Sequence, residues 1–365
     1  MRLGYSRKPD SSALLGQEAL VSDPVDYAAL GQSHFTVGLN PGDILDNRFL
    51  LIEIVSQGGM ATIFKAQDLQ DHNGAVAVKV PHLGIESNPA SFARFQREEE
   101  IGCRLNHPFI LKFIPVTGAK SRPYIVTEYL RGCTLSHLLG RMRPLPEKDA
   151  LKFASLICEA LQHLHEHGVI HRDLKPSNLM ICSEGRLRVM DFGISQSAES
   201  RRLTFVGFTT AMGTPDYIAP EQIKGRRGDR RSDIYSLGAV LYEMLTGAPP
   251  FEGDDPFVIM NTRMSGDPPA LRKLNPQLSP QAEEIVLRAL QRDPAKRYPT
   301  AAAMKADLDA PDQMRITGLC DHLQASTRWK RVLLLARHLF FIVVIPLGIQ
   351  VLLFLWIWYH HANKR

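Results

Sequence analysis

Cysteine is scarce in this sequence, and the few cysteines form no metal-binding pattern. The five residues are Cys103, Cys133, Cys158, Cys182 and Cys320, and no two of them stand in a CxxC pair. This argues against a zinc site and a disulfide-stapled fold, and it suits a reducing cytosol. A GxxxxGK loop is also missing, which excludes a Walker-type nucleotide site. The net charge of +5 is too small to indicate nucleic-acid binding.

The composition is that of a globular protein with a substantial core. The chain has 365 residues, of which 44% are hydrophobic and 22% charged, and this suits one large two-lobed domain or two ordinary ones. Positive charge gathers in one local run, formed by Lys224, Arg226, Arg227, Arg230 and Arg231. We interpret this run as a solvated loop, with a surface for an acidic substrate or a lipid as the alternative.

The amino-terminal residues 1–43 show no sustained hydrophobic periodicity, which predicts a mobile tail. The apolar run Ala13–Leu15 is too short for the core of a signal peptide. We therefore expect the amino terminus to stay in the compartment where it is made. A helical recognition segment within the tail is the alternative.

The stretch from His171 to Asn178 reads HRDLKPSN and carries the strongest chemistry. Asp173 can accept a proton from a hydroxyl group, and Lys175 can neutralise a transferring phosphoryl group. Asn178 offers an amide oxygen to a hard divalent cation. Phosphoryl transfer depends on positioning and charge neutralisation, so these three residues on one loop fit that reaction. Alone, so short a match is equally well explained as an ordinary polar loop.

Two segments upstream could contribute to a nucleotide site. Residues 49–55 predict a strand, and residues 56–64 predict a small-residue turn and a second strand whose backbone amides could approach a triphosphate. Taken alone, that pattern is better explained as an ordinary glycine hairpin. Residues 75–80 predict a strand in which Lys79 shares a face with Ala77, while three valines occupy the other face. A lysine in such a position needs an anion, unless the strand lies at an exposed edge.

Residues 92–105 then predict an amphipathic helix that ends near Asn106. It carries three consecutive glutamates, Glu98, Glu99 and Glu100. Such a run is usually a solvated face, but one glutamate could turn inward and pair with Lys79.

Taken in order, these motifs resemble those of the eukaryotic-type, or Hanks-type, serine/threonine protein kinases, and among them the bacterial membrane-bound members. The resemblance covers about residues 45–308 and rests on VAVK with Lys79, a helix glutamate, HRDLKPSN, Asp191–Gly193 and Ala219–Glu221. It implies an α+β, two-lobed protein kinase fold over residues 44–310, with a small β-rich amino-terminal lobe and a larger helical carboxyl-terminal lobe.

The resemblance also implies ATP and Mg²⁺ as cofactors, with Mn²⁺ as an alternative metal. Asp173 and Lys175 would be catalytic, and Asn178 and Asp191 would bind the metal. Lys79 would hold the nucleotide phosphates and pair with Glu98, chosen by its distance from Asn106. The implied ATP-binding residues are Gly58, Gly59, Ile63, Ala77, Lys79, Glu98, Thr127, Glu128 and Leu130.

Two other pairs follow from the same resemblance. Asp233, which could also cap the helix predicted from that residue, would brace the catalytic loop, and Arg297 would be the buried partner of Glu221. The sequence departs from the family pattern in one feature, the glycine-rich turn. Ser56 and Ala61 occupy two places where the family has glycine, which could raise the nucleotide concentration that the protein requires.

Residues 193–219 would form the activation loop. Arg172 is a fixed cation that could hold a phosphate there, and arginine–phosphate hydrogen bonds can order a loop. We expect autophosphorylation at Thr209 or Thr210. Thr214 is expected to shape the pocket for the substrate hydroxyl instead.

The carboxyl-terminal region has the pattern of a membrane anchor. After a basic linker over residues 311–338, residues 339–359 contain no charged side chain and are long enough to span a bilayer as one helix. Aromatic residues gather at the far end of this segment, as at a membrane interface. A buried soluble helix is the alternative. Only residues 360–365 would follow, so no extracytoplasmic sensor domain is expected.

Basic residues are more numerous before the span than after it, which predicts a single-pass protein of the bacterial inner membrane with its kinase domain in the cytoplasm. The predicted function is transfer of the ATP γ-phosphate to Ser and Thr hydroxyls of proteins. Expected partners are protein substrates and the lipid bilayer, with a homodimer left open and no nucleic acid. A nucleotide-binding pseudokinase scaffold is the main alternative. A small-molecule kinase is disfavoured by Ala219–Glu221 and by the helix that contains Asp233.

Overall fold

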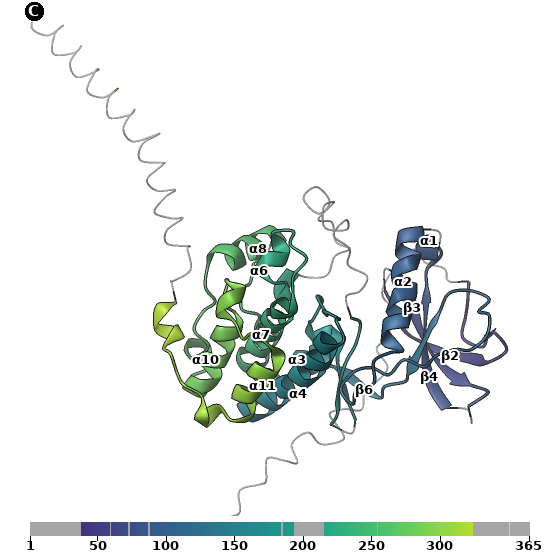
Figure 1. Ribbon diagram of the computed structural model, residues 1–365, viewed down its shortest axis with the longest axis horizontal. Helices are drawn as coiled ribbons and strands as arrows, with labels where there is room; N and C mark the ends of the chain where they lie inside the picture. The colour runs from purple at the N-terminus through teal and green to yellow at the C-terminus, as the bar shows by residue number, and fades with distance from the viewer. Residues whose placement is uncertain are drawn as a thin grey trace, which may run out of the picture.

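The computed structural model describes residues 38–58, 60–71, 74–86, 88–183, 185–192, 215–253, 255–323 and 350. These residues form two lobes, one built mainly of strands and the other mainly of helices (Figure 1). Several predictions fall outside the described residues: most of the tail over 1–43, Gly59, the three threonines Thr209, Thr210 and Thr214, and the segment 339–359 apart from Gln350.

The small lobe is a five-stranded antiparallel sheet in the order β1-β2-β3-β4-β5. Its strands are β1 (Ile44–Leu45), β2 (Phe49–Gln57), β3 (Ala61–Asp68), β4 (Gly74–Pro81) and β5 (Ile125–Glu128). In β4 the predicted alternation is confirmed: the valines are buried and Lys79 and Ala77 lie on the opposite face. This leaves the lysine on the face of the sheet that the core does not fill.

Two helices complete the small lobe, α1 (Leu83–Glu86) and α2 (Pro89–Gly102). The side chain of Asn88 caps α2 by accepting hydrogen bonds from Ala90 N and Ser91 N. The helix ends at Gly102, a few residues before the predicted end. A Cβ atom on Gly102 would lie 2.5 Å from the ring of Phe113, so only glycine lets α2 approach that ring. This packing fixes the position of the glutamate-bearing face of α2.

The large lobe combines a small sheet with a helical core. Its sheet contains β6 (Gly132–Thr134), β7 (Leu179–Cys182) and β8 (Leu187–Val189). Its α-helices are α3 (Leu135–Arg141), α4 (Glu147–Glu166), α6 (Pro220–Ile223), α7 (Arg230–Thr246), α8 (Pro256–Ser265), α9 (Leu271–Leu274), α10 (Pro280–Ala289) and α11 (Ala301–Asp309). Short 3₁₀ turns are η4 (Pro176–Asn178), η7 (Pro215–Tyr217), η8 (Pro294–Lys296), η9 (Pro311–Gln313) and η10 (Leu319–His322).

Helix α7 is the centre of the large lobe, with α4 and α10 packed against it. The prediction that it begins at Asp233 was wrong. The side chain of Asp229 accepts a hydrogen bond from Arg231 N and caps the helix one turn earlier. Gly247 ends the helix with a φ of 84°, a left-handed conformation that glycine adopts without strain. Asp233 therefore lies inside the helix, and its carboxylate is available to other elements.

Within the described residues, no helix is long and apolar enough to cross a membrane. The predicted spanning segment 339–359 lies outside these residues except at Gln350.

Three imidazoles stack at the carboxyl-terminal end of α4. The ring centroids of His107 and His163 lie 4.8 Å apart, and those of His163 and His167 lie 4.2 Å apart. Burial lowers the pKa of His107 and His163, and the neighbouring imidazoles lower that of His163 further. The folded protein therefore favours the neutral form of both rings.

This arrangement predicts that acid destabilises the fold. The unfolded chain binds protons on His107 and His163 near pH 6.5, above the pKa of these two residues in the folded state, so the unfolding free energy falls as the pH decreases through about 6.5. Urea unfolding at about pH 7.5 and about pH 5.5 measures this loss, which we expect to be smaller in His163→Gln. His137→Gln, outside the stack, is the control. Equal pH dependence in wild type and His163→Gln would contradict the assignment.

Candidate active site

The predicted catalytic loop, His171–Asn178, is held by a buried carboxylate, Asp233 of α7. Its Oδ2 accepts hydrogen bonds from His171 N at 2.9 Å and pairs with His165 Nε2 at 2.8 Å, while its Oδ1 accepts from Arg172 N at 2.8 Å. Arg172 adopts a φ of 63°, which is uncommon for a residue with a side chain. Asp233 thus braces the start of the HRDLKPSN stretch, as the sequence led us to expect.

Three polar side chains of that stretch converge in space. Lys175 Nζ lies 2.9 Å from Asp173 Oδ2. Asn178 Nδ2 donates to the backbone oxygen of Asp173 at 2.8 Å and to its Oδ2 at 3.2 Å. These bonds use the amide nitrogen of Asn178, so its amide oxygen is left for another partner. A carboxylate, an ammonium group and an amide oxygen are therefore presented together.

A backbone hydrogen bond brings the fourth polar residue to this loop. Met190 N donates to Asn178 O at 2.9 Å, which places Asp191 beside Asn178. Asp191 follows the end of β8 and has a φ of 50°, so the chain turns sharply there. This carboxylate therefore lies just beyond the end of a strand.

Lys79 joins the small lobe to Asp191. Its Nζ lies 2.6 Å from Glu98 Oε1 and 3.3 Å from Asp191 Oδ1. Burial alone would lower the pKa of Lys79, but the carboxylates of Asp191 and Glu98 outweigh it and raise the pKa above its usual value. The ammonium group in turn lowers the pKa of Asp191. The site therefore favours the charged forms of Lys79 and Asp191, while burial raises the pKa of Glu98 despite its contact with Lys79.

The structure separates Glu98 from its neighbour. Glu98 faces Lys79, whereas Glu99 Oε1 pairs with Lys120 Nζ at 2.5 Å. The choice of Glu98 as the partner of Lys79 matches this geometry. Lys120 also donates to Tyr124 O at 2.7 Å, so the second glutamate anchors α2 to the segment before β5.

Other residues predicted to contact ATP share one face of the small-lobe sheet. Ile63 is the cross-strand partner of Lys79, and Ala77 is the partner of Thr127. Gly58 N donates to Ala61 O at 3.0 Å and closes the turn between β2 and β3. Ile63, Ala77 and Thr127 therefore lie on the same face of the sheet as Lys79. Gly59 lies outside the described part of the chain.

Glu128, at the end of β5 where the chain leaves the small lobe, already forms hydrogen bonds within the protein. Glu128 N donates to Lys112 O at 2.9 Å, so the backbone N–H of this predicted ATP-binding residue is already used by a bond within the protein. The Glu128 side chain accepts from Lys112 N at 3.1 Å and from Arg188 Nε at 3.1 Å. Leu130 continues the chain toward β6.

Two contacts between the lobes were missed by sequence reasoning. Arg188 and Glu128 pair across 60 positions of sequence, which no local pattern indicates. Phe192 stacks on Phe113 at 5.8 Å and meets the edge of His171 at 6.2 Å. The second contact links the residue after Asp191 to both lobes. In the sequence, the only feature that pointed to this contact was that Phe192 directly follows Asp191.

The pair predicted between Glu221 and Arg297 is present and buried. Arg297 Nη1 and Nη2 each donate to one oxygen of Glu221 at 2.8 Å. Burial raises the pKa of Glu221, but the hydrogen bonds and charge of Arg297 outweigh it and lower the pKa below its usual value. The pair fixes α6 to the helical core near the catalytic loop.

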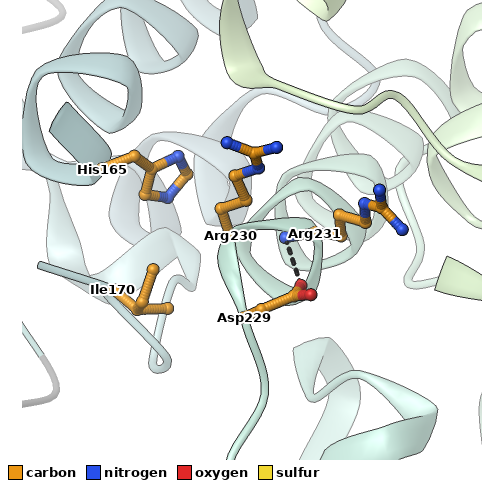
Figure 2. Close-up of a pocket in the computed structure, with 5 residues that line it drawn as sticks. All are labelled: His165, Ile170, Asp229, Arg230 and Arg231. Atoms are coloured by element: carbon orange, nitrogen blue, oxygen red, sulfur yellow. Dashed lines mark hydrogen bonds between the residues drawn. The ribbon is translucent and has the colours of Figure 1, made fainter. Parts of the chain in front are cut away.

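A pocket of about 380 Å³ lies at the start of α7, next to His165, the partner of Asp233 (Figure 2). It is lined by His165, Ile170, Asp229, Arg230 and Arg231. The carboxylate of Asp229 accepts from Arg231 N at 2.8 Å and occupies the end of the helix where an anion would bind, as the dashed line in Figure 2 shows. We assign no ligand to this pocket.

Comparison with known proteins identifies the family. A model of the protein kinase domain matches residues 49–308, so the chain belongs to the protein kinase family. Its relatives include bacterial serine/threonine-protein kinases, as the sequence resemblance predicted.

Three relatives illustrate the similarity. The serine/threonine-protein kinase PknB of Mycolicibacterium smegmatis is 38% identical over 282 residues, which cover 74% of this chain and 45% of the relative. PknB of Mycobacterium tuberculosis is 40% identical and is matched over 72% of this chain and 43% of its own length. A probable serine/threonine-protein kinase of Streptomyces coelicolor, SCO3848, is 38% identical over 73% of this chain and 40% of its own. The chain thus spans less than half the length of these relatives.

The fold also matches a solved kinase structure. The crystal structure of Rad53 1-466 in complex with AMP-PNP has a TM-score of 0.57 and 28% identity, and the match covers 71% of this chain and 64% of that one. The two-lobed protein kinase fold expected from the sequence is therefore confirmed.

Proposed function

We propose that this chain transfers the γ-phosphate of ATP to Ser and Thr hydroxyls of protein substrates. The observation that carries the proposal is the position of Lys79, whose ammonium group joins Glu98 of α2 to Asp191 beside the catalytic loop. This cation lies between the lobes, where the phosphates of a nucleotide would need one. The family membership and the serine/threonine kinases among its relatives support the same activity.

Each polar residue of the loop has a task in this proposal. Asp173 orients the acceptor hydroxyl and receives its proton, since its carboxylate is only partly covered. Lys175, at 2.9 Å from that carboxylate, neutralises charge on the transferring phosphoryl group. Lys79 holds the α- and β-phosphates. Adenine would lie against the sheet face that contains Ile63 and Ala77, beside Thr127, Glu128 and Leu130.

The residues present fit a divalent metal ion. Asp191 is kept charged by Lys79, and the side-chain oxygen of Asn178 is not used by the bonds to Asp173. Carboxylate and amide oxygens are hard ligands that suit Mg²⁺, with Mn²⁺ as an alternative. When bound, the metal would neutralise the phosphates. We propose Asn178 and Asp191 as its protein ligands.

Regulation of this site involves residues outside the described part of the chain. We propose Thr209 or Thr210 as the autophosphorylation site and Thr214 as part of the acceptor pocket. Arg172 is the proposed phosphate-binding cation, because it directly precedes Asp173 and a guanidinium group can donate several hydrogen bonds to a phosphate.

A direct test measures transfer of radiolabel from ATP to protein by the full chain in detergent micelles with magnesium. Wild type is expected to label Ser or Thr, and Asp173→Asn or Lys79→Met to reduce the rate by about 10²-fold or more. Phosphopeptide mapping of the same sample is expected to find Thr209 or Thr210 occupied.

No transfer from folded, nucleotide-binding wild type would instead favour a pseudokinase scaffold, for which Ser56 and Ala61 in the β2–β3 turn are the supporting observation. Active enzyme without phosphate at either threonine would refute the proposed autophosphorylation sites.

We further propose that residues 339–359 anchor the protein in the bacterial inner membrane, with the kinase domain in the cytoplasm. The support is the uncharged length of this segment and the excess of basic residues before it. The lipid bilayer would then be a partner of this segment, and cross-linking in membranes would show whether two copies also associate.

Charges placed inside the segment are expected to release the protein from membranes. The double substitution Val351→Arg and Leu353→Arg adds about 2.5–3.5 kcal/mol per charge to the cost of insertion. Fractionation after alkaline carbonate washing should show wild type in the pellet and the variant in the supernatant. His361→Arg, beyond the segment, is the matched control and should stay in the pellet. Equal retention of all three proteins would contradict the anchor.

A further inference from the structure

A fully buried arginine of α8, Arg263, has no part in the site as described so far. Its exposed fraction is 0%, and burial lowers its pKa. Burying a guanidinium group is costly unless hydrogen bonds compensate for lost water, so its position calls for defined partners. Its contacts show what these partners are.

Arg263 holds the main chain at the carboxyl-terminal end of the predicted activation loop. Its Nη1 donates to Ile218 O at 2.9 Å, and its Nη2 donates to Asp216 O. The ring of Phe251 lies under the guanidinium group, 5.3 Å from its central carbon. One planar side chain therefore fixes two alternate carbonyl groups of a single short segment, residues 215–219.

That segment is tied to the catalytic loop as well. Ala219 N donates to Gln222 Oε1 at 3.1 Å, and Gln222 Nε2 donates to Arg172 O at 3.4 Å. Arg172 directly precedes Asp173. The path from Arg263 to the proposed base therefore runs along the main chain from Ile218 to Ala219 and then through the side chain of Gln222 to the main chain of Arg172. At its other end the segment begins immediately after Thr214, the residue proposed for the acceptor pocket.

We propose that Arg263 is a positioning residue for the protein substrate. It fixes the carbonyl groups of Asp216 and Ile218, and so sets where the peptide flanking the acceptor hydroxyl lies relative to Asp173. The inference rests on the proposed kinase function and adds to it a residue that acts on the peptide and not on ATP. Arg263 itself does not touch the reacting atoms.

The chemistry of the side chain suggests a graded test. A guanidinium group presents several N–H donors in a rigid fork, whereas a lysine ammonium is a single point that cannot bind both carbonyls in the same geometry. Arg263→Lys keeps the charge and Arg263→Met removes both charge and donors. Misplacing a substrate by about 1 Å can cost up to about 10²-fold in rate, so a change of this kind is measurable.

The experiment measures KM for an acceptor peptide and KM for ATP with the full chain in detergent micelles. We expect Arg263→Met to raise the peptide KM about tenfold, Arg263→Lys to raise it less, and both to leave the ATP KM within about twofold. Arg292→Met is the matched control. Arg292 donates to Ser265 O at 3.0 Å and pairs with Asp267, so it contacts the end of α8 without touching residues 216–218.

Two results would overturn the proposal. The first is an unchanged peptide KM in folded Arg263→Lys. The second is a rise of the peptide KM in Arg292→Met as large as that in Arg263→Met, which would mean that Arg263 only anchors α8. Thermal unfolding monitors folding, and if Arg263→Met does not fold, Arg263→Lys decides the question. An inactive wild type would contradict the proposed kinase function itself. Failure of the kinase proposal is therefore distinguishable from failure of the proposal for Arg263.

Discussion

The need to neutralise one lysine organises the candidate site. Lys79 lies on β4 with a side chain that is 24% exposed, so its ammonium group needs carboxylate partners. Glu98 comes from α2, whose approach depends on Gly102, and Asp191 comes from the large lobe. Because the two carboxylates belong to different lobes, their shared cation couples the arrangement of the lobes to the charge state of the site. A nucleotide phosphate entering there would meet a cation that is already held in place.

A second buried charge has the same importance in the large lobe. Asp233 accepts two backbone N–H groups from the catalytic loop and pairs with His165. Since α7 is buried along most of its length, this carboxylate is fixed to the core of the lobe. The positive φ of Arg172 is maintained by these bonds. The position of Asp173 therefore depends on a residue that would not itself touch substrate.

Part of this could be predicted from local chemistry, and part only from the resemblance to protein kinases. The alternation in β4 places Lys79 and the valines on opposite faces, whereas the resemblance implied a helix glutamate as the partner of Lys79, and Glu98 was chosen among three by its distance from Asn106. The start of α7 was predicted wrongly because two aspartates four residues apart could each cap it, and only the structure shows that Asp229 does. The pair of Arg188 with Glu128 and the bonds of Arg263 to Asp216 and Ile218 had no local signal. They join segments that are distant in sequence, and two of their acceptors are backbone carbonyls, which every residue possesses.

The measurement that tests the central claim most directly compares the three consecutive glutamates of α2. kcat/KM for ATP would be determined for Glu98→Gln, Glu99→Gln and Glu100→Gln in the full chain, each change removing one charge with little change in shape. If the bridge from Lys79 to Glu98 and Asp191 assembles the ATP site, Glu98→Gln lowers kcat/KM by at least about tenfold, and Glu100→Gln leaves it within about twofold. Glu99→Gln, which loses only the pair with Lys120, should fall between them. Similar values for all three variants would contradict the account.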